Sequence, residues 1–253
     1  MLDAFLNQNL FHFLLVFVRL GTAMLVLPGL SSTYVSVNIR IVLAVTITLV
    51  ALPTVGAALP PAPDNTAFLV LLIAVEATIG VFLGMMAQFL LVPVSFAGNV
   101  MGFSTGLMMA QAFDPTTAQQ SALIAGFLGE VAMVMVFVTG MHHLMIEAVV
   151  NSYNAFPPGQ MPDTGDMVQL LVTLLSSGFR LGLQLAAPFV IYAILFNATL
   201  GVIARLMPQL NVLFVAMPAQ ILFGLALLMT TVPFLIYSFL GHFERGLINL
   251  ATP

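Results

Sequence analysis

The sequence contains no cysteine and no lysine, and charged residues make up only 6% of its 253 residues. Without cysteine the chain can form no disulfide, no thiolate metal site and no cysteine nucleophile. Without lysine it lacks the Walker-type lysine of a phosphate-binding loop, and it also lacks a nucleophile elbow. The sequence therefore predicts no enzyme, and it predicts no catalytic, cofactor-binding or metal-binding residues.

The shortage of charge also indicates the class of protein. Soluble domains carry about 25% charged residues, whereas this chain is 61% hydrophobic and has a mean hydropathy of +1.14. So few charges cannot cover a water-facing surface, so most of the exterior must face membrane lipid or other apolar protein. The net charge of −4 excludes a basic surface for nucleic acid. We expect one membrane-embedded unit.

Apolar runs close to or above the length of a membrane span follow one another along the chain. A spanning helix needs about 20 apolar residues. The runs are 11–30, 39–57, 67–96, 122–150, 167–206 and 213–240. Proline-rich segments at 59–65 and 156–166 interrupt them as loops. The sequence predicts an all-α, polytopic membrane protein with about six long, kinked hydrophobic helices arranged as hairpins.

The run 167–206 is about twice as long as a single span requires. It could form two spans joined by a tight turn near Pro188, or one kinked helix that extends beyond the bilayer. A helix of that length needs protein around its excess. We favour one kinked helix.

A glycine-rich stretch at about 98–115 lies in the middle of the chain. If Gly98, Gly102 and Gly106 are helical, their four-residue spacing places them on one face, where another backbone can approach closely. Gly80 and Gly84 repeat this spacing, as do two later glycines, Gly178 and Gly182. These pairs favour a protein whose helices pack tightly on other helices.

The second half of this stretch carries Met108, Met109 and Phe113, followed by Asp114-Pro115. Methionine is flexible and apolar, and Asp-Pro favours a break in the helix. Two interpretations stay open. One is a packed helix followed by a surface turn, and the other is a flexible apolar plug in a passage between helices.

Five charged residues fall inside the apolar runs. A charge at the centre of a spanning helix costs roughly 2.5 to 3.5 kcal/mol, so each needs a partner or a wet cavity. They form either an ion relay or structural pairs between arginines and glutamates at helix or subunit contacts. We favour the pairs, because no carboxylates cluster at short spacing. The residues are Arg19, Glu76, Glu130, Glu147 and Arg180.

His143 and Glu147 stand at positions i and i+4, which could hold two ligands of a metal. No third ligand is near in the sequence, and the adjacent His142 points to a different face of a helix. An ordinary interfacial histidine pair is the simpler interpretation.

Two segments carry a resemblance to a known family. The first combines Gly140-Met-His-His143 with Ser152-Tyr153 and Pro157-Pro-Gly159, and the second reads Gly201-x-x-x-Arg205-x-x-Pro208-Gln209-x-Asn211-Val212. Together they resemble the FliR family of flagellar export-gate proteins, which is related to the T component of type III secretion injectisomes. The likeness covers nearly the whole chain. Val35 to Arg40 departs from it, because a proline is expected just after the valine.

The resemblance implies a subunit that forms a closed helical ring with FliP-type and FliQ-type subunits, to which FlhB-type and FlhA-type proteins attach. It implies a place in the bacterial inner membrane, in the flagellar basal body, with unfolded proteins passing through the channel. Residues 1–166 would pack like a FliP-type subunit and 167–253 like a FliQ-type hairpin, with a plug that includes Met108, Met109 and Phe113.

The turn between the last two helices contains Arg205, Pro208, Gln209 and Asn211. The Arg205 guanidinium could bond the free carbonyls that end the preceding helix, or a neighbouring subunit's carboxylate. It could also act only as a charge that sets the topology. Two other functions remain open: an injectisome export subunit, and a small-solute or ion transporter. A transporter should show internal repeats, and we find no convincing one.

Overall fold

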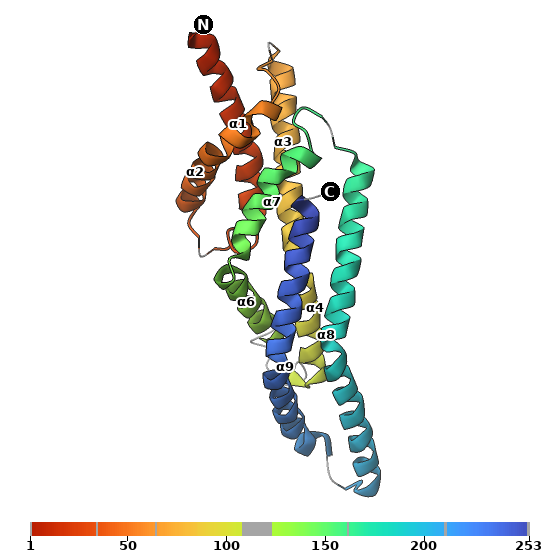
Figure 1. The fold of residues 1–253 in the computed structure, drawn as a ribbon. Helices are drawn as coiled ribbons and strands as arrows, with labels where there is room; N and C mark the ends of the chain where they lie inside the picture. Colours follow the sequence, from red (N-terminus) through yellow and green to blue (C-terminus); the bar gives the residue numbers. More distant parts are fainter. Residues whose placement is uncertain are drawn as a thin grey trace. The chain divides into compact units, whose positions relative to one another are not determined.

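The computed structural model describes residues 2–33, 35–63, 65–107, 123–160, 162–209 and 212–251 (Figure 1). All regular elements in these ranges are helical, which confirms the all-α prediction. The α-helices are α1 (Leu2–Val26), α2 (Val37–Val55), α3 (Thr66–Phe89), α4 (Val92–Ser104), α6 (Leu123–Val138), α7 (Met141–Ala155), α8 (Thr164–Leu206) and α9 (Val212–Ala251), and a short 3-10 turn, η1 (Gly56–Ala58), follows α2.

Several of these helices are long and apolar enough to cross a membrane. Within the described residues there are five such stretches, and α6 with α7 forms a sixth if the bent pair counts as one span. This confirms the prediction of about six hydrophobic helices. The run expected as a fourth span is two helices, however, because the chain bends by 75° between α6 and α7. Gly140 makes this bend with a φ of 76°, in the left-handed region that favours glycine.

Local signals at the helix starts explain where α2, α3 and α4 begin. The Ser36 hydroxyl accepts a hydrogen bond from the Ile39 N–H, and the Asn65 side chain accepts one from the Ala67 N–H. Such caps satisfy backbone donors that have no partner within the helix. Pro93 lies in the first turn of α4, where its missing N–H costs nothing. It therefore begins a new helix after the break at Leu90 and Leu91.

The segment 167–206 lies within a single helix, α8, of 43 residues with Pro188 inside it. The interpretation of this run as one helix, and not as two spans, is confirmed. The last run behaves in the same way, because α9 continues for 40 residues through Pro218 and Pro233. Both helices exceed the length that a bilayer needs.

The chain forms two compact units. Unit 1 comprises 1–90, 136–174 and 243–253, and unit 2 comprises 91–135 and 175–242. In unit 1, α1 packs chiefly on α3 and also contacts α2 and α7. Its buried face includes Leu15, Leu20 and Ala23.

The core of unit 2 contains side chains from four helices that are completely or nearly completely buried. These side chains are Val94, Ala97, Met101, Leu128, Ala132, Ala186, Phe189 and Phe239.

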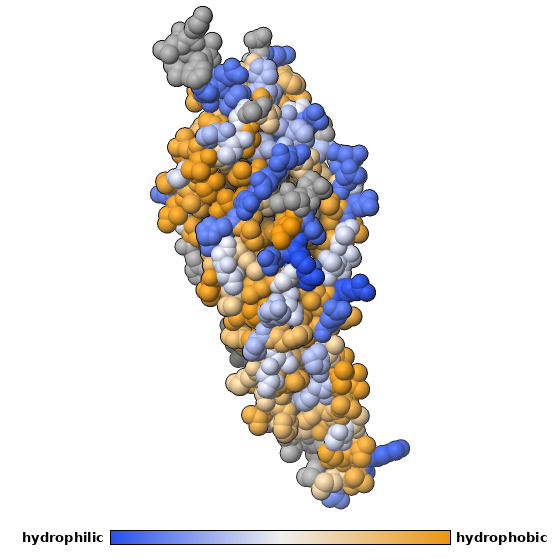
Figure 2. Space-filling model, viewed as in Figure 1, coloured by the Kyte–Doolittle hydropathy of each residue, from blue (hydrophilic) through white to orange (hydrophobic). Residues whose placement is uncertain are grey.

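The exterior of the chain is strongly apolar. Figure 2 shows hydrophobic residues over much of the visible surface. Val50 of α2, Met229 of α9 and Phe234 of α9 are 73%, 77% and 69% exposed. Only 11% of the apolar span in α8 and 17% of that in α2 is buried within the chain. These faces must meet lipid or other subunits.

Candidate functional site

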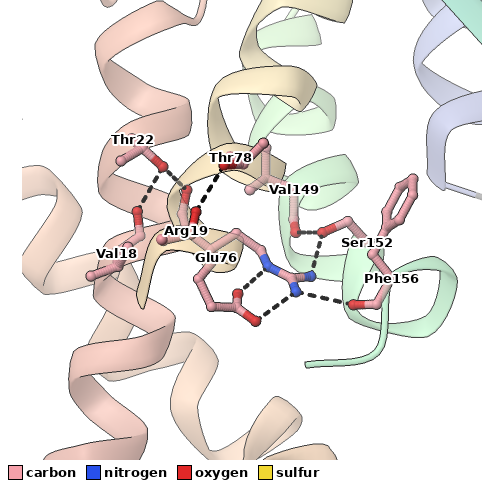
Figure 3. Close-up of polar contacts among 9 residues, drawn as sticks. Val18, Arg19, Thr22, Glu76, Thr78, Val149, Ser152 and Phe156 are labelled. Carbon is pink, nitrogen blue, oxygen red and sulfur yellow. Dashed lines mark hydrogen bonds and ion pairs between the residues drawn. The ribbon is translucent and has the colours of Figure 1, made fainter. Parts of the chain in front are cut away.

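A buried ion pair joins the first and third helices of unit 1. Arg19 of α1 and Glu76 of α3 are both completely buried. The Arg19 Nε–H donates to Glu76 Oε2 at 2.5 Å and the Nη2–H donates to Glu76 Oε1 at 3.0 Å (Figure 3). This two-bond geometry is the strongest that arginine and a carboxylate can form. The pair fixes α1 and α3 in one register.

The end of α7 completes the surroundings of the guanidinium. Arg19 Nη1 donates to the Ser152 hydroxyl at 3.2 Å, and Nη2 donates to the Phe156 carbonyl at 3.0 Å (Figure 3). The Tyr153 ring lies 3.8 Å from the guanidinium carbon, a cation–π contact. A buried ion pair offsets its desolvation only when such additional bonds are made. Arg19 thereby ties three helices together.

Glycines allow α1 and α3 to approach closely beside this pair. A Cβ added at Gly80, one turn after Glu76, would collide with the Thr22 hydroxyl and the Arg19 carbonyl oxygen. A Cβ at Gly84 would lie 2.9 Å from the Ala23 carbonyl oxygen. Small residues at four-residue spacing are typical of tight helix contacts in membranes. Gly80 and Gly84 therefore lie at a close helix crossing.

Unit 2 contains similar close contacts around α4. A Cβ at Gly98 would collide with the backbone of Ala125 in α6. A Cβ at Gly182 of α8 would lie 2.9 Å from the Pro93 carbonyl oxygen and from the Phe96 ring. Gly102 is buried in the same helix, α4.

Gly106 has a different role from the one expected of a helix-face glycine. Helix α4 ends at Ser104 with Thr105 as its C-cap, and Gly106 follows with a φ of 75°. A left-handed glycine just after the cap is a common helix ending. The prediction that the three glycines share one helix face does not hold for Gly106, because the helix stops before it.

A neutral hydrogen-bonded contact joins this helix end to α8 and α9. The Gln220 Nε2–H of α9 donates to the Ser104 carbonyl at 3.3 Å, and the Tyr192 hydroxyl of α8 donates to the Gln220 carbonyl at 2.7 Å. One turn further along α9, a Cβ at Gly224 would lie 2.7 Å from Thr105 Cβ. The last turn of α4 thus contacts α9, and Tyr192 joins α9 to α8 at the same place.

The other predicted residues do not join either contact. Glu130 of α6 and Arg180 of α8 are exposed in the chain by itself, so their pairing at subunit contacts stays a prediction. Arg205, Pro208 and Gln209 are exposed at the end of α8. Met108, Met109, Phe113 and Asn211 lie outside the described residues.

Sequence reasoning missed several residues of these contacts. Ser152 and Tyr153 form part of a family motif, but nothing in the sequence assigns them to Arg19. The Phe156 carbonyl carries no side-chain signal at all. Tyr192 and Gln220 are polar residues within apolar helices, which is the signal that could have drawn attention to them. Among the described residues, no three histidine or acidic side chains gather as a metal site.

Comparison with known proteins shows a matching family and several similar proteins. Residues 10–246 match the family described as bacterial export proteins, family 1. The chain is similar to the flagellar biosynthetic protein FliR of Caulobacter vibrioides, with 32% identity over 85% of each chain. It is similar to FliR of Bacillus subtilis, with 30% identity over 83% of this chain and 81% of the relative.

A relative with another name is more distant. The secretion system apparatus protein SsaT of Salmonella typhimurium is 23% identical over 71% of this chain and 70% of its own. The family match includes every residue of the Arg19 and Gln220 contacts. The chain therefore belongs to the FliR family of bacterial export proteins.

Proposed function

We propose that this chain is a structural channel subunit of the flagellar type III export gate, through which unfolded flagellar proteins cross the bacterial inner membrane. The observation that carries the proposal is the family match over residues 10–246, together with relatives that are named flagellar biosynthetic proteins. The subunit acts by forming and holding a passage in the basal body, not by chemical catalysis.

The exposed apolar helices support an assembly with other subunits. A helix of 43 residues with 11% of its apolar span buried extends beyond the bilayer on its own. Partner proteins that surround its excess would solvate it better than lipid or water. We infer that FliP-type and FliQ-type subunits form a closed ring with this chain, and that FlhB-type and FlhA-type proteins attach to the ring.

We further infer that two parts of the chain pack differently in the ring. Residues 1–166 pack in the ring like a FliP-type subunit, and 167–253 pack like a FliQ-type hairpin. The long α8 and α9, which follow one another directly in the sequence, suit a hairpin of this kind.

The stretch after α4 is our candidate for the plug of the closed channel. Met108, Met109 and Phe113 are apolar, and flexible methionines can fill an irregular gap. A hydrophobic constriction hinders ions because water leaves it. Replacing the three side chains with serine should make the assembled channel leak ions. An assembled variant that holds a membrane potential as well as the parent contradicts the plug.

The function is tested by replacement in the host bacterium. Deleting the gene should abolish swimming and export of flagellar proteins while leaving growth intact, and an intact copy should restore both. A tagged copy, solubilised gently from membranes, should retain other flagellar export subunits. Normal flagella in the deletion strain, or a tagged protein that purifies alone, would overturn the proposal.

The second candidate function is an injectisome export subunit, which the likeness to SsaT favours. The same purification separates the two, because the co-purifying proteins are either flagellar or injectisome components. A transporter is less favoured, and it would bind a small solute as a purified protein without partners.

A further inference from the structure

An apolar groove on unit 1 lies between α2 and α7. It encloses about 630 Å³ and is lined by Leu30, by residues of α2 and by residues of α7. The wall from α2 consists of Leu43, Thr46, Ile47, Val50, Ala51 and Thr54. This spacing of three and four residues is the stripe that one helix presents to another. The groove therefore has a shape into which a helix can pack.

The side chains of the α2 wall suit a helix more than a loose acyl chain. Ala51 is small, and the Thr46 and Thr54 hydroxyls donate to carbonyls of their own helix, Val42 and Ala51. Small and hydroxylated residues are enriched where helices meet within membranes. Val50 is 73% exposed on the same stripe, so a partner that fills the groove would cover it.

Two histidines, His142 and His143, and one charged residue interrupt the apolar lining. Glu147 of α7 is exposed and forms part of the groove wall, next to Ile146 and Val150. Among the residues that the structure describes, no group donates a hydrogen bond or forms an ion pair with the Glu147 carboxylate. An unpaired carboxylate at membrane depth is costly and needs a counter-charge or a donor. Glu76 has such a partner in Arg19, whereas Glu147 has none among the described residues of its unit.

We propose that the groove between α2 and α7 binds an apolar membrane helix of another subunit, and that this helix carries one arginine or lysine that pairs with Glu147. Burial of the apolar stripe supplies contact area, and the ion pair sets the register of the incoming helix. Electrostatic complementarity of this kind selects the correct partner more than it adds affinity. The proposal rests on the proposed function only in expecting the partner to be an export subunit.

The test places a photo-crosslinking amino acid at Val50, inside the groove, in the full chain and in native membranes. The matched control is Leu49, which is 58% exposed on the same helix but does not line the groove. Crosslinking at Val50 should give a protein adduct whose crosslinked peptide is an apolar helix with a basic residue, and Leu49 should not give that adduct. An adduct with lipid alone, with a second copy of this chain, or with the same protein from both positions overturns the proposal.

The charge is tested with Glu147→Arg. It should lower the yield of the Val50 adduct by at least about tenfold, because the reversed charge faces the partner's cation across a water-poor contact. Glu147→Gln should lower the yield less, and Asp166→Arg, at an exposed position in the first turn of α8, should leave it unchanged. Changing the partner's basic residue to glutamate should restore the Glu147→Arg adduct. An undiminished yield with Glu147→Arg, or no restoration, overturns the ion pair.

The two proposals fail in distinguishable ways. If the crosslinked helix carries the basic residue but belongs to a protein unrelated to export, the groove inference stands and the export function falls. If export subunits co-purify with the chain but none of them crosslinks at Val50, the export function stands and the groove inference falls.

Discussion

Each unit joins its helices through an internal polar contact, but the two contacts differ in charge and in completeness. In unit 1 the Arg19 guanidinium is completely buried and bonds a carboxylate, a hydroxyl and a carbonyl. In unit 2 the contact between Tyr192, Gln220 and Ser104 is neutral and only partly buried. A buried charge must be fully paired, whereas a neutral amide tolerates partial exposure. Unit 1 is therefore the more sensitive to single changes.

The largest expected effect comes from breaking the ion pair from one side. Arg19→Leu leaves Glu76 buried without its counter-charge and should destabilise the chain by about 3–5 kcal/mol, so that little protein accumulates in membranes. The double variant Arg19→Leu with Glu76→Leu should recover much of the level, because neither charge remains. The measurement is the amount and the melting temperature of the protein in gentle detergent. A double variant that accumulates less than either single variant would contradict this account.

Adding one methyl group at the close helix contacts compares the two units directly. Gly80→Ala presses on the Arg19 carbonyl and Gly98→Ala presses on the Ala125 backbone, so each should cost about 1–3 kcal/mol. The loss at Gly80 should be the larger, because the displaced backbone carries Arg19. Gly201→Ala is the control, since nothing lies within 4 Å of its added Cβ. Melting temperatures of the three variants check the order, and equal values for all three would refute the close contacts.

The neutral contact should give a smaller loss. Tyr192→Phe removes the hydrogen bond to the Gln220 carbonyl and should cost about 0.5–1.5 kcal/mol without abolishing export. Tyr237→Phe on α9, where the side chain is 80% exposed, is the matched control and should be neutral. Thermal melting with a motility assay separates the two outcomes. A Tyr192→Phe variant as unstable as Arg19→Leu would remove the distinction between the units.

The smallest effect is expected for an exposed arginine. Arg205 is exposed at the end of α8, so Arg205→Lys should change stability by no more than about 0.5 kcal/mol. The same substitution at Arg19 should be severe, because an ammonium cannot reproduce the planar set of bonds to Glu76, Ser152 and Phe156. Export of flagellar proteins by the two variants gives the comparison. Loss of export in Arg205→Lys with normal membrane insertion would indicate a specific contact at Arg205.

Hydropathy was enough to predict the class and the approximate number of long helices. The prolines predicted the loops at 59–65 and 156–166, although α8 already begins at Thr164. Hydropathy could not predict the bend at Gly140, because a left-handed glycine leaves the apolar character of the run unchanged. It could not predict the end of α4 before Gly106 for the same reason. The composition of a segment indicates whether it can span a membrane, whereas a bend depends on the backbone angles of single residues.

The contacts between helices were predictable in kind but not in detail. Arg19 and Glu76 needed partners, and the sequence offered four glutamates within or near the spans for two arginines. Which glutamate meets Arg19 depends on how α1 crosses α3, and Gly80 and Gly84 decide that crossing. Glu130 and Arg180 looked equivalent to the buried pair in the sequence, yet both are exposed in the chain.

The partners of Arg19 become available one after another as the chain is synthesised. Glu76 follows Arg19 by 57 positions, and Ser152 and Phe156 follow it by 133 and 137. At about 5–20 residues per second, Arg19 leaves the ribosome about 3–11 seconds before Glu76 and about 7–27 seconds before Phe156. During that interval Arg19 in the nascent first helix has no carboxylate to pair with. A ribosome that stalls before residue 76 should therefore leave a nascent chain whose first helix inserts into the membrane less stably, because Arg19 has no carboxylate to pair with.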